Sequence, residues 1–130
     1  MAFYLDTSAA VKLVVPEPAT RLLSTWARTH AESLISSDLL RTELLRATRR
    51  GAPDQMSRAR AVLDSITIVA LPTATFERAA DLETGLMRSL DAVHLAAALE
   101  LGDDLDGIIT YDERLAEAAA IHGATVVAPR

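Results

Sequence analysis

The sequence predicts an α/β fold, a three-layer α/β/α sandwich around a mostly parallel central sheet, built as a single domain by residues 1–130. Three observations lead to this prediction. The chain has 130 residues, half of them hydrophobic, which suffices for one ordinary core. Short apolar runs alternate with longer segments of helical periodicity. The runs are apolar throughout, a pattern typical of parallel strands that helices cover on both faces.

The first half of the chain begins with an apolar run over residues 3–5, expected as a strand. A Thr-Ser pair can cap a helix over residues 7–13, and a Pro-Glu-Pro segment ends it. A second helix then continues to about residue 30. Residues 33–35 form a second short strand. A Ser-Asp pair caps the next helix, which continues to residue 50 and stops at Gly-Ala-Pro.

The middle of the chain is expected to hold three helices and one strand. A helix covers residues 54–64. The β-branched run over residues 65–71 is a candidate for a buried strand, and a proline ends it. Helices follow over residues 73–86 and 89–101, the second of them almost wholly apolar.

The last part repeats the strand–helix–strand pattern. Residues 107–110 form a strand, a helix covers residues 112–121, and a glycine ends it before a last strand over residues 124–127. In parallel sheets of this kind, functional sites form beyond the carboxyl ends of the strands. Residues that directly follow a strand are therefore the first candidates for a site.

Composition excludes several classes of protein. The chain has no cysteine, which excludes disulfides, thiol nucleophiles and cysteine-bound zinc, and fits a protein of the reducing cytoplasm. No apolar run approaches the roughly 20 residues that span a bilayer, so no membrane association is expected. The first residues lack the basic region of a signal peptide. The net charge of −5 argues against binding nucleic acid by bulk electrostatics.

Two of the strand-like segments end in an acid. FYLD ends at Asp6 and GIITYD ends at Asp112, so both acids are expected at the carboxyl edge of the sheet. Each also precedes a helix and can serve as its N-cap. Taken singly, the N-cap is the preferred interpretation of either residue.

Two further acids lie on helices. Glu43 stands beside the apolar stripe of its helix, where a carboxylate is costly unless it is paired or binds a metal. The alternative is a boundary glutamate paired with Arg41 or Arg46, and the two interpretations have about equal weight. Asp91 is placed in the first turn of a helix capped by Ser89, where the helix dipole alone would favour an acid.

The four acids together favour a metal site. Carboxylates gathered at one sheet edge would repel one another and raise each other's pKa values, and a divalent cation removes this penalty. Mg²⁺ or Mn²⁺ prefers such hard oxygen ligands. A metal of this kind can activate water and stabilise an in-line phosphoryl displacement. The set Asp6, Glu43, Asp91 and Asp112 therefore indicates phosphodiester hydrolysis.

At this point the sequence resembles a known family. The segments YLDTSA, SDLLRTELLRA, SLDAVHLAAALELG and GIITYDERL follow in order the pattern of PIN domains, and the terminal GATVVAP extends the likeness. Within that family the sequence is most similar to the VapC-like toxins of bacterial toxin–antitoxin pairs. The resemblance covers nearly the whole chain, and the ordered set of motifs is more specific than any one of them.

The resemblance implies a Mg²⁺- or Mn²⁺-dependent endoribonuclease with an α/β/α sandwich fold. It matches the four acids to the family's acidic set and matches Ser8 and Thr110 to hydroxyl positions beside that set. It also implies a homodimer, a VapB-like antitoxin that neutralises the toxin, and structured RNA such as tRNA or rRNA as substrate. The mechanism it suggests is hydrolysis by metal-activated water that leaves a 5′-phosphate and a 3′-hydroxyl.

Other residues allow two interpretations. From residue 41 to residue 60, six arginines outnumber two acids. In this cluster Arg46, Arg49 and Arg50 either contact RNA or form a solvated helix face. His94 lies three residues after Asp91 and is expected to be hydrogen-bonded inside a packed helix, not to bind a metal.

The aromatic Trp26, with Leu22 and Leu23, lines an antitoxin groove or belongs to the core. The acids Asp103, Asp104 and Asp106 are expected in a solvated turn before a strand.

Two classes of rival function remain. A haloacid-dehalogenase-type phosphatase would need a second Asp where Ser8 stands. A receiver domain would need a distant lysine, whereas the only lysine is Lys12 in the first helix. The second class is a non-catalytic RNA- or protein-binding module with a structural cation. RNA binding without cleavage would favour that module.

Overall fold

A computed structural model describes residues 1–82 and 87–130 of the chain. In this part the strands form one sheet in which every pairing is parallel and the order is β3-β2-β1-β4-β5. The strands are β1 (Ala2–Leu5), β2 (Leu34–Ser37), β3 (Thr67–Val69), β4 (Leu105–Ile109) and β5 (Val126–Val127). The α/β class and the parallel sheet expected from the sequence are confirmed.

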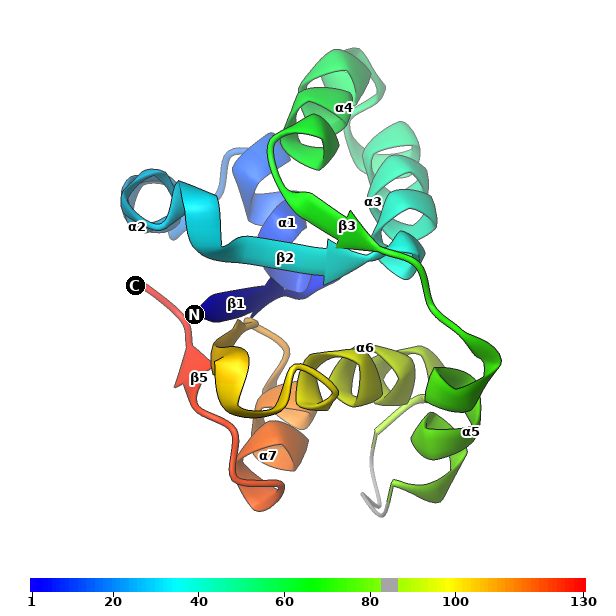
Figure 1. Cartoon of the computed structure of the whole chain (residues 1–130). Helices are drawn as coiled ribbons and strands as arrows, with labels where there is room; N and C mark the ends of the chain where they lie inside the picture. The colour runs from blue at the N-terminus through cyan, green and yellow to red at the C-terminus, as the bar shows by residue number, and fades with distance from the viewer. Residues whose placement is uncertain (83–86) are drawn as a thin grey trace.

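Helices cover both faces of the sheet (Figure 1). One face packs against α1 (Thr7–Val14), α2 (Thr20–Thr29), α3 (Asp38–Gly51) and α4 (Met56–Asp64). The other face packs against α6 (Ser89–Leu99) and α7 (Glu113–Ile121), while α5 (Thr73–Asp81) lies against α6. Short 3₁₀ turns precede β2, α4 and β4, namely η1 (Ala31–Ser33), η2 (Pro53–Gln55) and η3 (Gly102–Asp104).

The two halves of the core are separated by the pleat of the central strands. Successive side chains of a strand point to opposite faces. In β1, Tyr4 packs with α6 and α7, whereas Leu5 packs with α1 and α3. In β4, Ile108 and Ile109 divide between the same two faces. Apolar residues without alternation therefore stabilise both layers, as the sequence pattern predicts.

The order of the strands reverses at β1. The chain runs outward from β1 to β2 and β3, then crosses to β4 and β5 on the other side of β1. In open parallel sheets, the crevice at such a reversal lies beyond the carboxyl ends of the two strands and commonly holds the ligand. Here these are the ends of β1 and β4, where Asp6 and Thr110 follow directly. The backbone N–H of Asp6 donates to the carbonyl of Ile109, which keeps the two ends side by side.

Several expected boundaries were wrong. The strand expected over residues 65–71 is confined to β3 and is not buried, because it pairs only with β2 at the edge of the sheet and its Thr67 is exposed. The strand expected over residues 107–110 begins earlier, at Leu105, which pairs with Ala2. Asp106 therefore lies on β4 and not in a turn, although it is exposed.

Two helices also differ from expectation. The helix expected over residues 73–86 ends at Asp81, and positions 83–86 lie outside the described residues. The N-cap of α6 is Arg88, without a capping bond from its side chain, and not Ser89. Asp91 nevertheless lies in the first turn of α6, as expected. Among the described residues, no helix is long and apolar enough to cross a membrane.

Candidate functional site

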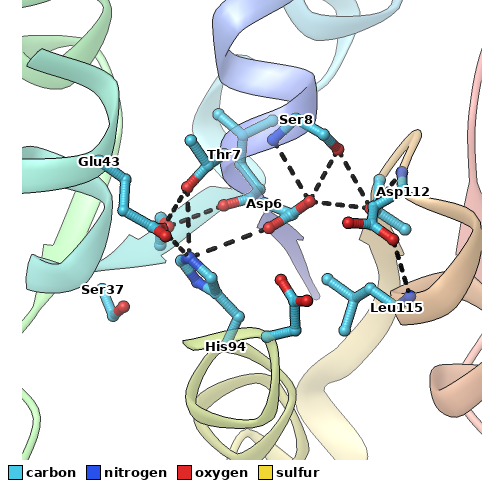
Figure 2. Close-up of polar contacts among 12 residues, drawn as sticks. Asp6, Thr7, Ser8, Ser37, Glu43, His94, Asp112 and Leu115 are labelled. Carbon is cyan, nitrogen blue, oxygen red and sulfur yellow. Dashed lines mark hydrogen bonds and ion pairs between the residues drawn. The ribbon is translucent and has the colours of Figure 1, made fainter. Parts of the chain in front are cut away.

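Asp6 is the most firmly held of the four acids. It is only 3% exposed and stands between the end of β1 and the start of α1, whose N-cap it forms. Its Oδ2 accepts hydrogen bonds from the hydroxyls of Ser8 and Thr110 at 2.7 and 2.9 Å and from the Ser8 backbone N–H at 3.3 Å (Figure 2). The hydroxyls of Ser8, in the first turn of α1, and of Thr110, directly after β4, thus fix the carboxylate of Asp6 in the crevice.

The two hydroxyls also connect the neighbouring strand ends. Ser8 Oγ accepts the backbone N–H of Tyr111 at 2.9 Å, and the Thr110 hydroxyl accepts that of Asp112 at 3.1 Å. Both expected hydroxyl positions therefore adjoin Asp6. Because their bonds end on Asp6 and on the backbone after β4, they orient the acid.

Asp112 is the N-cap that the sequence favoured, and its second oxygen is paired with an arginine. Its Oδ1 accepts the backbone N–H groups of Arg114 and Leu115 at 2.9 and 3.2 Å, so it is the N-cap of α7. Its Oδ2 lies 3.6 Å from Nη2 of Arg88. One carboxylate oxygen therefore accepts hydrogen bonds from the start of α7, and the other faces the guanidinium of Arg88.

Glu43 reaches the same site from α3. Its Oε1 accepts the Thr7 hydroxyl at 2.6 Å and lies 2.5 Å from Nε2 of His94. Arg41, one of the two expected partners, pairs with Asp38 instead. Burial opposes ionisation of Glu43, but the hydrogen bonds from His94 and Thr7 outweigh it and hold the pKa of this carboxyl below its usual value.

His94 is a site residue that sequence reasoning placed only in the packed core. It is 1% exposed, and its Nδ1 lies 2.8 Å from the Tyr4 hydroxyl, which donates to Ser37. Its Nε2 also lies 3.9 Å from Oδ1 of Asp6. Because carboxylates only accept, Nε2 must carry a proton to bond Glu43. Figure 2 shows His94 between Asp6 and Glu43.

The signal for this role was present in the sequence. His94 is the one polar residue within the apolar stretch AVHLAAA of α6, and a buried polar side chain needs a partner. Sequence could not identify that partner, because Glu43 is 51 residues away. The expected hydrogen bonding inside a packed helix is confirmed, with the addition that one bond goes to an acid of the site.

Asp91 enters the crevice from the first turn of α6. Its Oδ2 lies 3.3 Å from Nε of Arg88, three residues earlier, and its side chain is 12% exposed. Burial raises the pKa of Asp91, and the negative charges of Asp112 and Asp6 raise it further, although Arg88 acts in the opposite direction. The surroundings of Asp91 therefore disfavour its ionised form, despite the ion pair with Arg88.

The chemistry of this donor set fits a hard divalent cation. Carboxylates from four elements meet at one edge of the sheet. The pKa of Asp91 is raised first by burial and then by the charges of Asp112 and Asp6, and a bound cation would offset both effects. The side chains are not preassembled, however. In residues 1–82 and 87–130, no group of three or more His, Cys, Asp or Glu side chains is arranged to hold a metal ion. Arg88 instead bridges Asp91 and Asp112.

The expected RNA-contacting arginines lie apart from the acids along α3. Arg46, Arg49 and Arg50 are exposed and line a surface hollow of about 260 Å³. They follow Glu43 by one to two helical turns. The arginines are therefore accessible on the helix that carries Glu43, and their contact with RNA remains a prediction.

The apolar residues of α2 divide between the two alternatives. Leu23 is fully buried in the core, whereas Leu22 is 49% exposed. Trp26 packs its ring edge-on against Phe3 and also borders an open apolar hollow that Leu22 helps to line. Trp26 thus belongs partly to the core and partly to a surface that remains available to a partner.

Comparison with known sequences gives close relatives. The chain matches the PIN domain family over residues 3–121. It is 38% identical over 130 residues to Ribonuclease VapC47 of Mycobacterium tuberculosis (strain CDC 1551 / Oshkosh), covering 97% of this chain and 96% of the relative. It is also 38% identical over 128 residues to Ribonuclease VapC46 of Mycobacterium tuberculosis (strain ATCC 25618 / H37Rv), covering 98% of each.

Solved structures share the fold at lower identity. The Mycobacterium tuberculosis toxin VapC20, described as cleaving the sarcin-ricin loop, aligns with a TM-score of 0.73 and 15% identity over 90% of this chain and 95% of that one. A chain of a toxin–antitoxin complex from Klebsiella pneumoniae aligns with a TM-score of 0.74 and 22% identity over 100% of this chain and 98% of that one. At these identities the likeness concerns the fold.

Proposed function

Because this chain belongs to the PIN-domain family, and within it to the VapC ribonucleases, we propose that it cleaves RNA at the carboxyl edge of its sheet. It is a VapC-like ribonuclease toxin of a type II toxin–antitoxin system. The proposal adds that it is an endoribonuclease, that it uses Mg²⁺ or Mn²⁺, and that Asp6, Glu43, Asp91 and Asp112 carry the chemistry.

The observation that carries this assignment is the placement of Asp6. A nearly buried carboxylate at the reversal of strand order is costly unless its surroundings favour the charge. The hydroxyls of Ser8 and Thr110 orient one of its oxygens, and Asp91 is close enough for the two acids to repel. Such an arrangement is useful when a cation and an anionic substrate meet there.

In the proposed mechanism, Asp6 and Asp91 would hold the principal metal ion, and Glu43 and Asp112 would complete the site directly or through water. Mg²⁺ or Mn²⁺ bound there would supply a Lewis acid for water and for the charge on the phosphate. Ser8 and Thr110 keep Asp6 in place, and His94 with Thr7 keeps Glu43 ionised and directed into the crevice. Hydrolysis would leave a 5′-phosphate and a 3′-hydroxyl.

The partners follow from the same assignment. A solved structure with this fold is a toxin–antitoxin complex, and we expect a VapB-like antitoxin that covers the crevice of this chain. We expect the chain to be a single domain of residues 1–130 that forms a homodimer. Its expected substrate is structured tRNA or rRNA in the cytoplasm. Arg46, Arg49 and Arg50 are the expected RNA contacts, since they are exposed on the helix that carries Glu43. Their charge compensates locally for the acidic chain.

The test is incubation of the purified, antitoxin-free protein with total RNA and Mg²⁺ or Mn²⁺. Controls are EDTA and the Asp6→Asn variant, in which asparagine can still cap α1. Discrete fragments that disappear in both controls would support the assignment, and their ends give the cleavage position. A clean Asp6→Asn preparation that cleaves like the wild type would refute it. Tight RNA binding without cleavage would favour the binding module.

A further inference from the structure

Arg88 occupies a distinctive position among the acids. Within residues 1–82 and 87–130, it is the only arginine or lysine that lies within 4 Å of any of the four carboxylates. It is the N-cap residue of α6, and its guanidinium contacts Asp91 in the first turn of that helix and Asp112 at the start of α7. The same charge also favours ionisation of Glu43. One guanidinium therefore balances charge for three acids.

Arg88 competes for the oxygen atoms that a metal would need. Asp112 uses Oδ1 to cap α7 and turns Oδ2 to Arg88. Asp91 also turns its Oδ2 to Arg88. A divalent cation bound to these oxygens would repel a guanidinium held beside them. A cation that takes Oδ2 of either acid therefore displaces Arg88 from that carboxylate.

The displaced guanidinium would remain at the mouth of the crevice. The Arg88 side chain is 68% exposed, and its backbone is anchored at the start of α6. A guanidinium presents five N–H donors in a planar fork that matches the oxygens of a phosphate, and phosphate is the anion that RNA brings to this edge. An arginine in this place can therefore exchange carboxylate partners for phosphate partners.

We propose that Arg88 is a substrate-binding residue with two successive sets of partners. Before a metal binds, its guanidinium pairs with the carboxylates of Asp91 and Asp112. Once the metal binds these carboxylates, the guanidinium binds the non-bridging oxygens of the scissile RNA phosphate. This proposal rests on the proposed ribonuclease function for its second half only. Competition between Arg88 and a cation follows from the ion pairs themselves.

The test uses Arg88→Ala and Arg88→Lys, with Arg28→Ala as the control. Arg28 is exposed in the last turn of α2, which leads through η1 to the start of β2 and so lies toward the opposite edge of the sheet (Figure 1). Mn²⁺ affinity is measured without RNA by electron paramagnetic resonance of the free ion. Cleavage of an RNA that the wild type cuts is measured at saturating Mn²⁺, so that altered metal affinity does not mask the result.

Arg88→Ala should bind Mn²⁺ about two- to fivefold more tightly, the size expected for competition from a largely exposed ion pair. Its kcat/KM should fall about 100- to 1,000-fold, as for loss of a donor that stabilises developing charge. Arg88→Lys should fall between, since lysine keeps the charge without the fork, and Arg28→Ala should resemble the wild type.

Weaker or unchanged Mn²⁺ binding by Arg88→Ala would overturn the competition, and undiminished cleavage would overturn the role in substrate binding. If the wild type cleaves no RNA, the proposed function fails. The Mn²⁺ measurement would still test the competition on its own.

Discussion

Replacement of Asp91 by asparagine should make the metal-free protein more stable and the metal-loaded protein less stable than the wild type. Burial and the charges of Asp112 and Asp6 raise the pKa of Asp91. A carboxyl whose pKa is higher in the folded than in the unfolded state contributes stability at low pH and loses it as the pH rises through the folded value. At pH 7, ionised Asp91 therefore destabilises the fold, and a neutral side chain removes that cost.

The size of the effect follows from opposing contributions. Asparagine loses an ion pair to an arginine that is 68% exposed and a favourable charge in the first turn of α6, and solvent screens both of these contributions. It gains relief from burial of a charge and from repulsion, and the raised pKa means that this gain is larger. We expect a small net gain in the free energy of unfolding, seen as a rise of about 2 °C or less in Tm for a chain of this length.

Metal should reverse the order of the two proteins. An ion present at 100 times its Kd stabilises the folded state by about 2.7 kcal/mol, which corresponds to about 10 °C here. Asp91→Asn should lose most of this increase because a ligand is missing, and it should lose cleavage as well. Thermal unfolding followed by circular dichroism in EDTA and in Mn²⁺ measures both parts.

The matched control is Asp106→Asn, which neutralises an exposed acid on β4 and should change neither curve. A lower Tm of Asp91→Asn in EDTA would contradict the electrostatic reasoning. An increase in Mn²⁺ equal to that of the wild type would remove Asp91 from the metal site.

Three further predictions concern other parts of the site. The double variant Arg49→Ala/Arg50→Ala should bind RNA more weakly, and the slope of log Kd against log salt should fall by up to about two, one for each lost phosphate contact. Fluorescence anisotropy at several salt concentrations measures both quantities. An unchanged slope would mean that these arginines only form a solvated helix face. Glu43 has a lowered pKa, so its stabilisation is present above 4.5 and is lost as the pH falls through the lower folded-state value; urea unfolding between pH 3 and 7 should therefore depend less on pH in Glu43→Gln, and an equal dependence would contradict this. Asp112→Ala should lower the free energy of unfolding by about 0.5–2 kcal/mol through loss of the cap of α7, whereas Asp112→Asn should keep most of it; equal losses in urea titrations would mean that the cap is not what Asp112 contributes.

Much of the fold could be predicted from the sequence because its causes are local. Apolar runs, capping residues and Gly or Pro stops define most strands and helices, and the absence of alternation predicts a sheet covered on both faces. The hydrophobic pattern gave a wrong prediction of burial where burial depends on the position of a strand in the sheet. The run around β3 has the composition of a buried strand, but it forms an edge and so is only partly covered. Strand order depends on packing of the whole chain, which no local window contains.

The candidate site was predictable in part for the same reason. Asp6 and Asp112 follow strands directly, so the topology of any parallel sheet brings them to one edge. Glu43 and Asp91 were suggested by their helix positions, beside an apolar stripe and in the first turn of an apolar helix, and the ordered motifs supported the same set. Their partners could not be predicted, because the contacts from Glu43 to Thr7 and His94 join three elements. The ion pairs from Arg88 to Asp91 and Asp112 could not be predicted either, because they depend on how α6 packs against α7.

An N-cap and a role in the site, which the sequence left as alternatives for Asp6 and Asp112, are compatible in this structure. A carboxylate has two oxygens, and each of these acids gives one oxygen to the start of a helix. In both cases the other oxygen faces a cationic or polar group of the crevice, His94 for Asp6 and Arg88 for Asp112. Capping fixes the rotation of the side chain and thereby aims the remaining oxygen. For Asp6 and Asp112, the helix starts after β1 and β4 therefore leave one carboxylate oxygen of each acid directed at the crevice, where the proposed metal site would use it.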